Sequence, residues 1–360
     1  MLPSLADTMA RLLAGPREAG SPAAAAARDL VATHLEARGW RVERQRFTFA
    51  PSAVLGLPVF GAGLGALGLV LLPATTAVAL PSWTALLLLV GGGAALAALA
   101  LGIGLGWLPL GPGLREDANL VATRGDDPVR RWLVAHLDTK AQVQSMAGRL
   151  VTVWLLALTL AALLGTALLR LRGPLPLEPA AAVAGLAVIA GALAGRGRLK
   201  GGSPGARDNG SGVAALLAAA EEAGPADTGL LVTGAEEFGL VGARIFASQA
   251  RDRLGEAVIV NLDTIDQEGA LALVYHDERG EALARRLAPI LGGAGMPARL
   301  RRLPAGILTD SVPFARAGVP AVTIGRLTWR TLRLIHTPRD TADGLSLAMA
   351  ERVGRVLGTN

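Results

Sequence analysis

The sequence contains no cysteine, few aromatic residues and little charge for its length. None of its 360 residues is Cys, 4% are aromatic and 18% are charged, whereas 51% are hydrophobic and the mean hydropathy is +0.44. Without cysteine, a disulfide framework and thiolate chemistry are excluded, so any chemistry must use carboxylate, imidazole, hydroxyl or amine groups. The apolar weight lies in Ala, Leu, Val and Gly, which favours lipid-embedded helices over an aromatic-rich β-barrel.

The basic charge of the chain has a simple explanation at a membrane. The formal net charge is +6 and the isoelectric point is near 10.9. The basic residues are almost all Arg, and they are scattered through the sequence or crowded beside apolar runs, with no stripe typical of nucleic-acid binding. We therefore expect a lipid bilayer as a partner and no nucleic acid.

Long uncharged runs predict the membrane spans. No Asp, Glu, Lys or Arg occurs between Arg46 and Arg115, which leaves room for two helices of the ~20 residues that a bilayer requires. Pro73, Pro81 and Ser82 are expected to form the turn between them. The fourth run is short and rich in Ala and Gly, so a buried soluble helix is its alternative. The four predicted spans are Ala53–Leu72, Trp83–Leu110, Leu150–Leu169 and Pro179–Gly195.

Two hairpins, at residues 53–110 and 150–195, return the chain to the side of the membrane it left. Residues 1–50, 112–148 and 197–360 are then expected to form one domain on that side. Many more basic residues flank this side than the opposite turns, which predicts a cytoplasmic domain of a multi-pass protein of the cell membrane. Residues 1–20 also lack the apolar core of a signal peptide.

The remaining segments alternate between helical and strand-like patterns. Helices are predicted at Ala23–Arg38, Ser211–Ala223 and Glu281–Leu291. Between them lie short apolar runs typical of buried strands. This order predicts an α/β fold with a mostly parallel mixed sheet sandwiched by helices, whose functional groups gather beyond the carboxyl ends of the strands. The predicted strands are Trp40–Phe49, Asn119–Thr123, Trp132–Ala135, Gly229–Thr233, Ala257–Val260, Ala270–Tyr275 and Ala321–Ile324.

Polar side chains follow the predicted strand Trp132–Ala135 and precede the predicted helix Ser211–Ala223. His136 and Asp138 follow a strand directly, as in metal sites where a carboxylate fixes the tautomer of a histidine, although such a pair is also common on surfaces. Asp208 lies in a glycine-rich turn that opens a helix, where a helix N-cap is the alternative role. Ser211 is available as that cap, which would leave Asp208 free to bridge two cations.

The later strand ends add further carboxylates and a second imidazole. Glu236 and Glu237 follow a buried strand, where adjacent carboxylates repel unless a cation or a shared proton relieves them. Asp263 ends another apolar strand, and His336 begins the run His-Thr-Pro-Arg-Asp-Thr. We expect no role for the remaining histidines, His34 and His276.

Together these residues fit a binuclear metal site. They offer two imidazoles and three carboxylates, enough for one His and one acid on each ion with a shared Asp between them. Zinc is the first choice, with other divalent ions as alternatives. Such a pair would activate a water, and Glu236 remains as the base that takes its proton. The expected metal ligands are His136, Asp208, Glu237, Asp263 and His336.

The order and surroundings of these motifs resemble the di-zinc aminopeptidases of metallopeptidase family 28, whose relatives include glutamate carboxypeptidase and glutaminyl cyclase. The matching segments are Ala135–Thr139, Gly205–Gly212, Ala235–Leu240, Asn261–Asp263 and Ile335–Thr341. A sixth similar segment, Thr309–Phe314, includes Asp310 and Ser311. The resemblance covers nearly all the soluble segments and excludes the apolar insertions.

The resemblance implies a role for each residue. His136 and Asp263 would bind one zinc, Glu237 and His336 the other, and Asp208 would bridge them. Glu236 would be the catalytic base and Asp138 would orient His136. The Asp208–Asn209 peptide matches a position that is often cis in the family. Two neighbours of the site differ from the family, namely Arg207, where an acid is common, and Ser311, where His is common.

The function that follows is a membrane-anchored zinc metallopeptidase, expected to be an aminopeptidase that acts on small peptides. An amidohydrolase or cyclase on the same scaffold is one alternative, because only the pocket would differ. A non-catalytic membrane receptor or transport component is another, although such proteins often lack ligands that are all present here. The sequence leaves the side-chain preference and the oligomeric state open.

Overall fold

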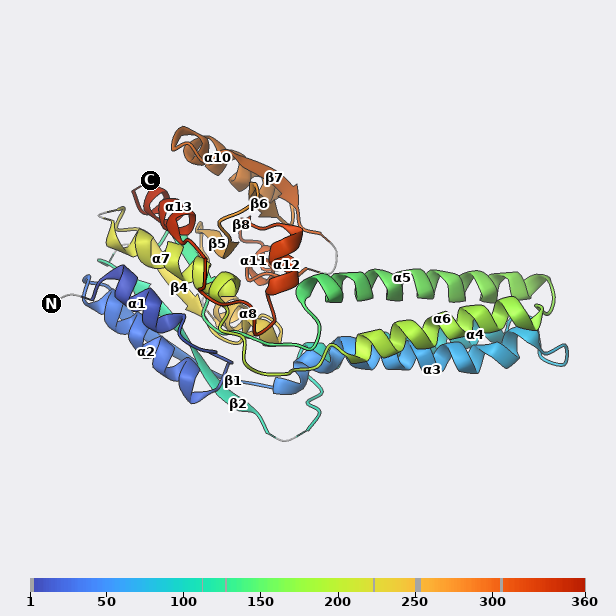
Figure 1. Ribbon diagram of the computed structural model, residues 1–360. Coiled ribbons are helices and arrows are strands. Elements are labelled where there is room, and N and C mark those ends of the chain that lie inside the picture. The colour runs from blue at the N-terminus through green and yellow to red at the C-terminus, as the bar shows by residue number, and fades with distance from the viewer. Residues whose placement is uncertain are drawn as a thin grey trace. The chain divides into compact units, whose positions relative to one another are not determined.

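The structure, a computed structural model, describes residues 3–111, 113–126, 128–222, 224–249, 254–304 and 307–359 (Figure 1). The predicted boundary at residue 112 and the predicted helix end at Ala223 lie outside these residues. The chain forms two compact units. The sheet unit comprises Met1–Phe49, Leu114–Ala141 and Gly201–Asn360, and the helical unit comprises Ala50–Gly113 and Gln142–Lys200. Residues 142–148 and 197–200 thus group with the helices.

The sheet unit is built on eight strands in the order β1-β2-β4-β3-β5-β8-β6-β7. The central strands β4, β3, β5 and β8 run parallel, β6 and β7 are parallel to each other, and the remaining neighbours are antiparallel. This confirms the predicted α/β class with a mostly parallel mixed sheet. The strands are β1 Arg41–Phe49, β2 Arg115–Thr123, β3 Arg131–His136, β4 Thr228–Thr233, β5 Val258–Ile265, β6 Leu271–Tyr275, β7 Ala298–Arg302 and β8 Ala321–Arg326.

Helices cover both faces of this sheet (Figure 1). Successive residues of a strand point to opposite faces, and β3 shows this directly. Leu133 and Ala135 join a core with helices α1, α2, α7, α10 and α13, whereas Trp132 and Val134 join one with α8 and α11. The helices are α1 Leu5–Leu12, α2 Pro22–Glu36, α7 Ser211–Glu221, α8 Val241–Gln249, α10 Glu278–Gly293, α11 Ser311–Arg316, α12 Trp329–Leu334 and α13 Ala348–Thr359.

The structure differs from the sequence prediction at two local points, a helix cap and an additional strand. Ser211 does not cap helix α7, because the N-cap residue is Gly210 and the Ser211 hydroxyl donates to the carbonyl of Arg207 at 2.6 Å. Asn209 satisfies the helix end instead, since its side-chain oxygen accepts from the backbone N–H of Gly212 at 2.9 Å. Strand β7 was not predicted, because its Ala-Arg-Leu-Arg-Arg sequence lacks the apolar run of a buried strand.

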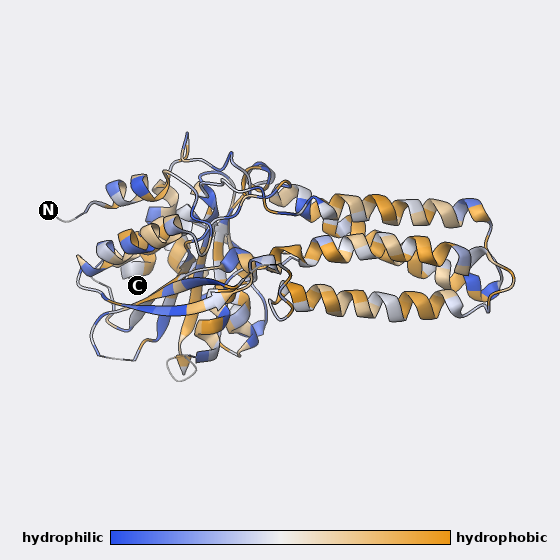
Figure 2. Cartoon of the chain, turned by 90° about the horizontal axis from the view of Figure 1, so that it is seen from below, coloured by the Kyte–Doolittle hydropathy of each residue, from blue (hydrophilic) through white to orange (hydrophobic). Residues whose placement is uncertain are grey.

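The helical unit contains helices α3 Gly56–Thr76, α4 Thr84–Gly104, α5 Met146–Leu169 and α6 Leu177–Gly195, with short turns η1 Pro51–Leu55 and η2 Arg170–Arg172. All four helices are long and apolar enough to cross a membrane, and their hydrophobic colour sets them apart in Figure 2. Pro73 lies inside α3 and not in the following turn, because the helix continues to Thr76. Helix α4 ends at Gly104, short of the predicted Leu110.

Helices α3 and α6 pack through small residues. The glycines Gly61, Gly65 and Gly68 on α3 face Ala184, Ala187, Gly191 and Ala194 on α6. A Cβ added at Gly61 would clash with the Cβ of Ala194, and one at Gly191 would lie 2.5 Å from the carbonyl oxygen of Gly61. The two backbones therefore approach as closely as glycine permits, as at small-residue helix interfaces in membranes.

The packing predicts that Gly61→Val destabilises the helical unit, because the added carbons would force α3 and α6 apart. Overpacking of this kind costs about 1–3 kcal/mol. Thermal unfolding of the detergent-purified chain measures the effect. The matched control is Gly91→Val on α4, where an added Cβ meets nothing within 4 Å. Equal melting temperatures for the two variants would contradict the predicted role of the α3–α6 contact.

Candidate metal centre

The five ligands predicted from the sequence converge at the carboxyl ends of the central strands. His136 is the last residue of β3, Glu237 follows β4 in the turn η4 Glu236–Phe238, and Asp263 lies within β5. Asp208 lies in the turn η3 Ala206–Gly210 that precedes α7, and His336 follows α12. Parallel strands thus bring together residues that are up to 200 positions apart, at the edge of the sheet where α/β proteins bind ligands.

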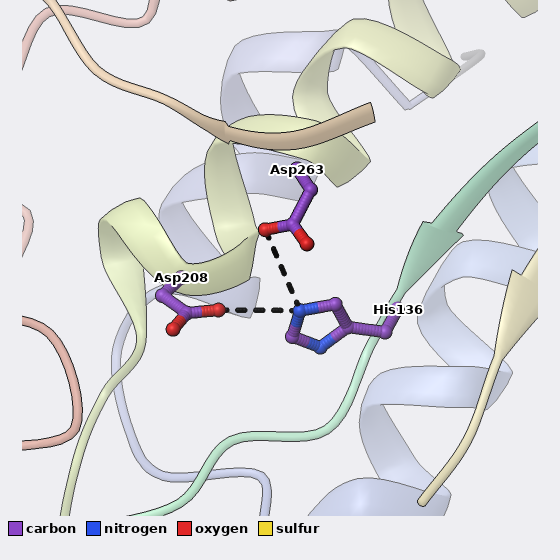
Figure 3. Close-up of side chains that lie close together, drawn as sticks. All are labelled: His136, Asp208 and Asp263. Carbon is purple, nitrogen blue, oxygen red and sulfur yellow. Dashed lines mark ion pairs between the residues drawn. The ribbon is translucent and has the colours of Figure 1, made fainter. Parts of the chain in front are cut away.

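The ligand atoms form two groups that share Asp208. His136 Nε2 lies 3.2 Å from Asp208 Oδ1 and 3.9 Å from Asp263 Oδ1, as Figure 3 shows. His336 Nε2 lies 3.1 Å from Asp208 Oδ2 and 3.2 Å from Glu237 Oε1. Each carboxylate oxygen of Asp208 therefore faces a different imidazole, which is the arrangement a bridging carboxylate requires.

The donor set fits a borderline divalent ion. Nitrogen and carboxylate oxygen are ligands that zinc accepts, and each group offers one imidazole and two carboxylates. Within the described part of the chain, Glu237 Oε1 is buried without a hydrogen-bond partner, although it points toward His336. A buried carboxylate oxygen without a donor is costly, and a cation bound between these ligands would satisfy it.

Mutual charge sets the protonation of the ligands. Burial alone would raise the pKa of Asp208, but hydrogen bonds and charge from the two imidazoles hold it well below its usual range. Burial alone would lower the pKa of both His136 and His336, but the surrounding carboxylates raise each of them. Burial raises the pKa of Asp263 to about 6, against the opposing charge of His136. The pKa of each of these ligands therefore depends strongly on the charges of the others.

Glu236 lies in a setting different from that of its neighbour. Burial, together with the nearby carboxylates of Glu237, Asp310 and Asp263, raises the pKa of Glu236 well above its usual value, against the charge of His136. Burial raises the pKa of Glu237, but the charges of His336 and Lys140 lower it further, to about 2. Two adjacent carboxyl groups therefore have opposite proton affinities, which is a pattern typical of distinct acid–base roles.

Asp138 contacts both sides of the site. Its backbone carbonyl lies 3.1 Å from His136 Nδ1, whereas its carboxylate is 3.9 Å away from that nitrogen. The carboxylate instead accepts hydrogen bonds from the backbone N–H groups of Glu236 at 3.0 Å and Glu237 at 3.2 Å. Burial raises the pKa of Asp138 to about 7. One residue therefore fixes the imidazole with its main chain and the Glu-Glu turn with its side chain.

The backbone around the ligands takes uncommon conformations. The Asp208–Asn209 peptide bond is cis. Ala235 before the Glu-Glu turn, Thr264 after Asp263, and His336 itself have positive φ angles of 52°, 51° and 61°. Non-glycine residues rarely adopt this region, and such outliers cluster at functional sites. Thr264 also coincides with a register shift between β5 and β8, which redirects the chain at Asp263.

The structure adds residues to which sequence analysis assigned no role. Lys140 Nζ lies 2.7 Å from Glu237 Oε2 and is buried with it. Asp340 accepts the backbone N–H groups of Arg207 at 3.0 Å and Asp208 at 3.1 Å, so it holds the turn that carries Asp208. Asp310 is fully buried and accepts a hydrogen bond from Thr233. Lys140 and Asp340 were detectable only as polar neighbours of the motifs.

The other two histidines lie outside the site. His34 is buried on α2, where Nδ1 lies 2.8 Å from Thr8 Oγ1, and burial lowers the pKa of its imidazole to about 4. His276 lies in the turn between β6 and α10. Neither contributes an atom to the two ligand groups.

The chain is similar to known proteins in its family match and in its fold. Residues 189–359 match the family described as Peptidase family M28, a range that holds every candidate ligand except His136. A zinc aminopeptidase from Bacillus subtilis is 17% identical, with a TM-score of 0.59 over 99% of this chain and 94% of that one. An aminopeptidase from Aneurinibacillus sp. strain AM-1 is 16% identical, with a TM-score of 0.57 over 98% and 91%.

A glutaminyl cyclase from Fimbriiglobus ruber has the same fold, with 16% identity and a TM-score of 0.56 over 98% of this chain and 92% of that one. No curated protein sequence gives a significant match. The resemblance expected from the motifs is confirmed by the family match and by the fold.

The shared position of Asp208 predicts unequal effects of two ligand variants. Asp208→Ala should remove more bound zinc per chain than Asp263→Ala, because Asp208 contributes to both ligand groups and Asp263 to one. Elemental analysis after dialysis against zinc measures the difference. Asp29→Ala, an exposed carboxylate on α2, is the control and should keep the wild-type content. Equal losses in the two ligand variants would contradict a bridging Asp208.

Proposed function

We infer that this chain, a member of peptidase family M28, is a zinc-dependent aminopeptidase held in a membrane by its helical unit. The observation that carries this inference is the pair of ligand groups joined through Asp208. The family match and the fold of the aminopeptidases support a peptide substrate. The proposed substrate class is small peptides, hydrolysed at the amino-terminal residue.

We assign one zinc to His136 and Asp263 and the other to Glu237 and His336, with Asp208 as the bridge. The contacts of 3.1–3.9 Å between these side chains support that assignment. When bound, a zinc pair supplies Lewis acidity that polarises the scissile carbonyl and makes water nucleophilic at neutral pH. The protein contributes the fixed positions of the ligands, which Lys140, Asp138 and Asp340 hold from behind.

Glu236 is the proposed general base. Burial raises its pKa, so its carboxylate has an increased affinity for a proton, which suits a group that takes a proton from water and passes it to the leaving amine. Its backbone N–H is held by the carboxylate of Asp138, so the position of the turn is fixed relative to the His136 loop. Asp138 is then a positioning residue for both His136 and Glu236.

A cyclase or amidohydrolase activity is the second candidate. The glutaminyl cyclase neighbour supports it, because the same fold carries that chemistry at an identity close to that of the aminopeptidases. The two activities would use the same ligands and differ in the pocket. A panel that contains both aminoacyl-nitroanilides and glutaminyl peptides separates them.

Membrane anchoring and a cytoplasmic site complete the proposal. Arg149, Arg196, Arg198 and Lys200 flank the helix ends that lead along the chain into the sheet unit. The opposite turn of the second hairpin carries Arg170, Arg172 and Glu178, and the guanidinium of Arg170 is buried against the carbonyls of Ala74, Ala77 and Leu80. An excess of basic residues on the sheet-unit side favours a cytoplasmic location.

The base assignment predicts that Glu236→Gln keeps its zinc but loses peptide hydrolysis. The amide retains the shape of the side chain and cannot accept the proton, so kcat should fall by about 10²–10⁴-fold. Hydrolysis of the substrate panel and the zinc content of the same preparation provide the measurement. Glu222→Gln, at the C-cap of α7, is the control and should keep full activity. Retention of activity by Glu236→Gln would exclude it as the base.

The proposed sidedness predicts the labelling of single cysteines in a chain that otherwise has none. A membrane-impermeant maleimide should label Val78→Cys in intact cells, because Val78 is 82% exposed in the turn between α3 and α4. Asp29→Cys in the sheet unit should react only after the cells are permeabilised. The reverse pattern would place the sheet unit outside the cytoplasm. If neither cysteine were labelled in permeabilised cells, the result would contradict the solvent exposure of positions 78 and 29.

A further inference from the structure

Arg17 is a fully buried cation that belongs to no motif. It lies between α1 and α2, only 2% exposed, and its side-chain hydrogen bonds end on carbonyl oxygens. Nε donates to Leu137 at 3.0 Å, Nη1 donates to Leu12 at 3.0 Å and to Pro204 at 2.7 Å, and Nη2 donates to Gly205 at 3.1 Å. Burial of an arginine is expensive, so a side chain bonded in this way serves a defined geometric purpose.

Three of the four carbonyls that Arg17 binds, those of Leu137, Pro204 and Gly205, belong to the two loops that carry candidate ligands, and the fourth ends helix α1. Leu137 lies between His136 and Asp138, and Gly205 begins the turn that presents Asp208. A single arginine fork therefore connects the backbone beside one ligand to the backbone beside another. It makes no hydrogen bond to the turn of Glu237 or to the segment of His336 among the bonds of the described residues.

The main chain of Arg17 strengthens this connection. Its N–H donates to Thr139 Oγ1 at 2.8 Å, and its carbonyl accepts the N–H of Thr139 at 3.1 Å. The Thr139 hydroxyl in turn donates to the carbonyl of Ser203 at 2.9 Å. The loops touch directly at this point, because a Cβ added at Gly205 would overlap the side chain of Thr139. The distance between the His136 and Asp208 loops is thus fixed by contact and by hydrogen bonds.

We propose that Arg17 is a positioning residue of the metal centre, which sets the geometry of the metal held by His136, Asp208 and Asp263. This rests on the proposed zinc site. Arginine suits the task because its planar guanidinium serves several carbonyls at once, which the ammonium of lysine cannot do in the same geometry. Partners behind the direct ligands commonly change metal affinity by about 10–100-fold. The metal between Glu237 and His336 shares only Asp208 with these loops and should be affected less.

The test compares zinc affinity in Arg17→Met, Arg17→Lys and the wild type as detergent-purified full chains. Competition with a chelator of known affinity should show one metal equivalent weakened by about 10–100-fold in both variants, with the other changed much less. The absorption spectrum of the cobalt-loaded protein should change as well, because the ligand geometry changes. Thermal unfolding of the metal-free proteins separates these effects from a loss of stability.

Arg28→Met is the matched control, because Arg28 is another buried arginine near the amino terminus. It is paired with Asp117, and among the described residues its side chain bonds to no ligand loop, so its loss should lower stability and leave zinc affinity unchanged. If Arg17→Met does not fold, Thr139→Val provides the test, since it removes the hydroxyl link alone and should shift the same equivalent less strongly.

Two results would overturn the inference, and they are distinguishable. Wild-type zinc affinity in the Arg17 and Thr139 variants, or an equal loss in Arg28→Met, would reduce Arg17 to a structural residue and leave the zinc peptidase standing. A wild-type chain that binds no zinc would overturn the proposed function together with this inference.

Discussion

The free-energy cost of burying several carboxyl groups in one region constrains the structure of the sheet unit. Carboxyl groups of Asp138, Asp208, Glu236, Glu237, Asp263 and Asp310 lie buried or nearly buried in one region. Repulsion among buried carboxylates costs free energy, which favourable partners reduce. The partners come from every direction: two imidazoles face Asp208, Lys140 pairs with Glu237, backbone N–H groups bind Asp138, and Thr233 donates to Asp310. Among the described residues, Glu237 Oε1 keeps no hydrogen-bond partner and lies in one of the two groups that could hold a metal ion.

The sequence revealed the candidate ligands because each one follows a local pattern. His136, Glu237 and Asp263 follow or end apolar strands, and parallel strands bring such residues to one edge. Asp208 was indicated by its glycine-rich turn, and His336 by the run of polar residues that it begins. Arg17 and Lys140 carry no such pattern, since their partners are backbone carbonyls and a side chain distant in sequence. Strand β7 escaped prediction for a related reason: an edge strand with exposed arginines does not need to be apolar.

The helical unit shows what hydropathy predicts and what it cannot. The absence of charge located all four helices, because a membrane span must be long and uncharged. It did not locate the end of α4, since residues 105–110 remain apolar after the helix stops. The stop is conformational: Gly106 has a φ of +74°, and the N–H groups of Trp107 and Leu108 bond back to the carbonyl of Gly102. A backbone signal of this kind, a Schellman-like reversal, leaves no trace in hydropathy.

The second hairpin interrupts the sequence between the motifs of His136 and Asp208, and each unit holds its own part of this junction together. Thr139 and Ser203 are hydrogen-bonded within the sheet unit, and Gln142 and Leu199 form a bridge within the helical unit, where the N–H of Val143 also bonds the carbonyl of Arg198. The segments that enter and leave the insertion are therefore paired with each other at its base. Closing a loop costs free energy that grows only slowly with its length, so a paired base lets the insertion lengthen into a helical hairpin while the two ligand loops stay in register. Within the sheet unit, Arg17 is bonded to both ligand loops, where we propose that it sets this register.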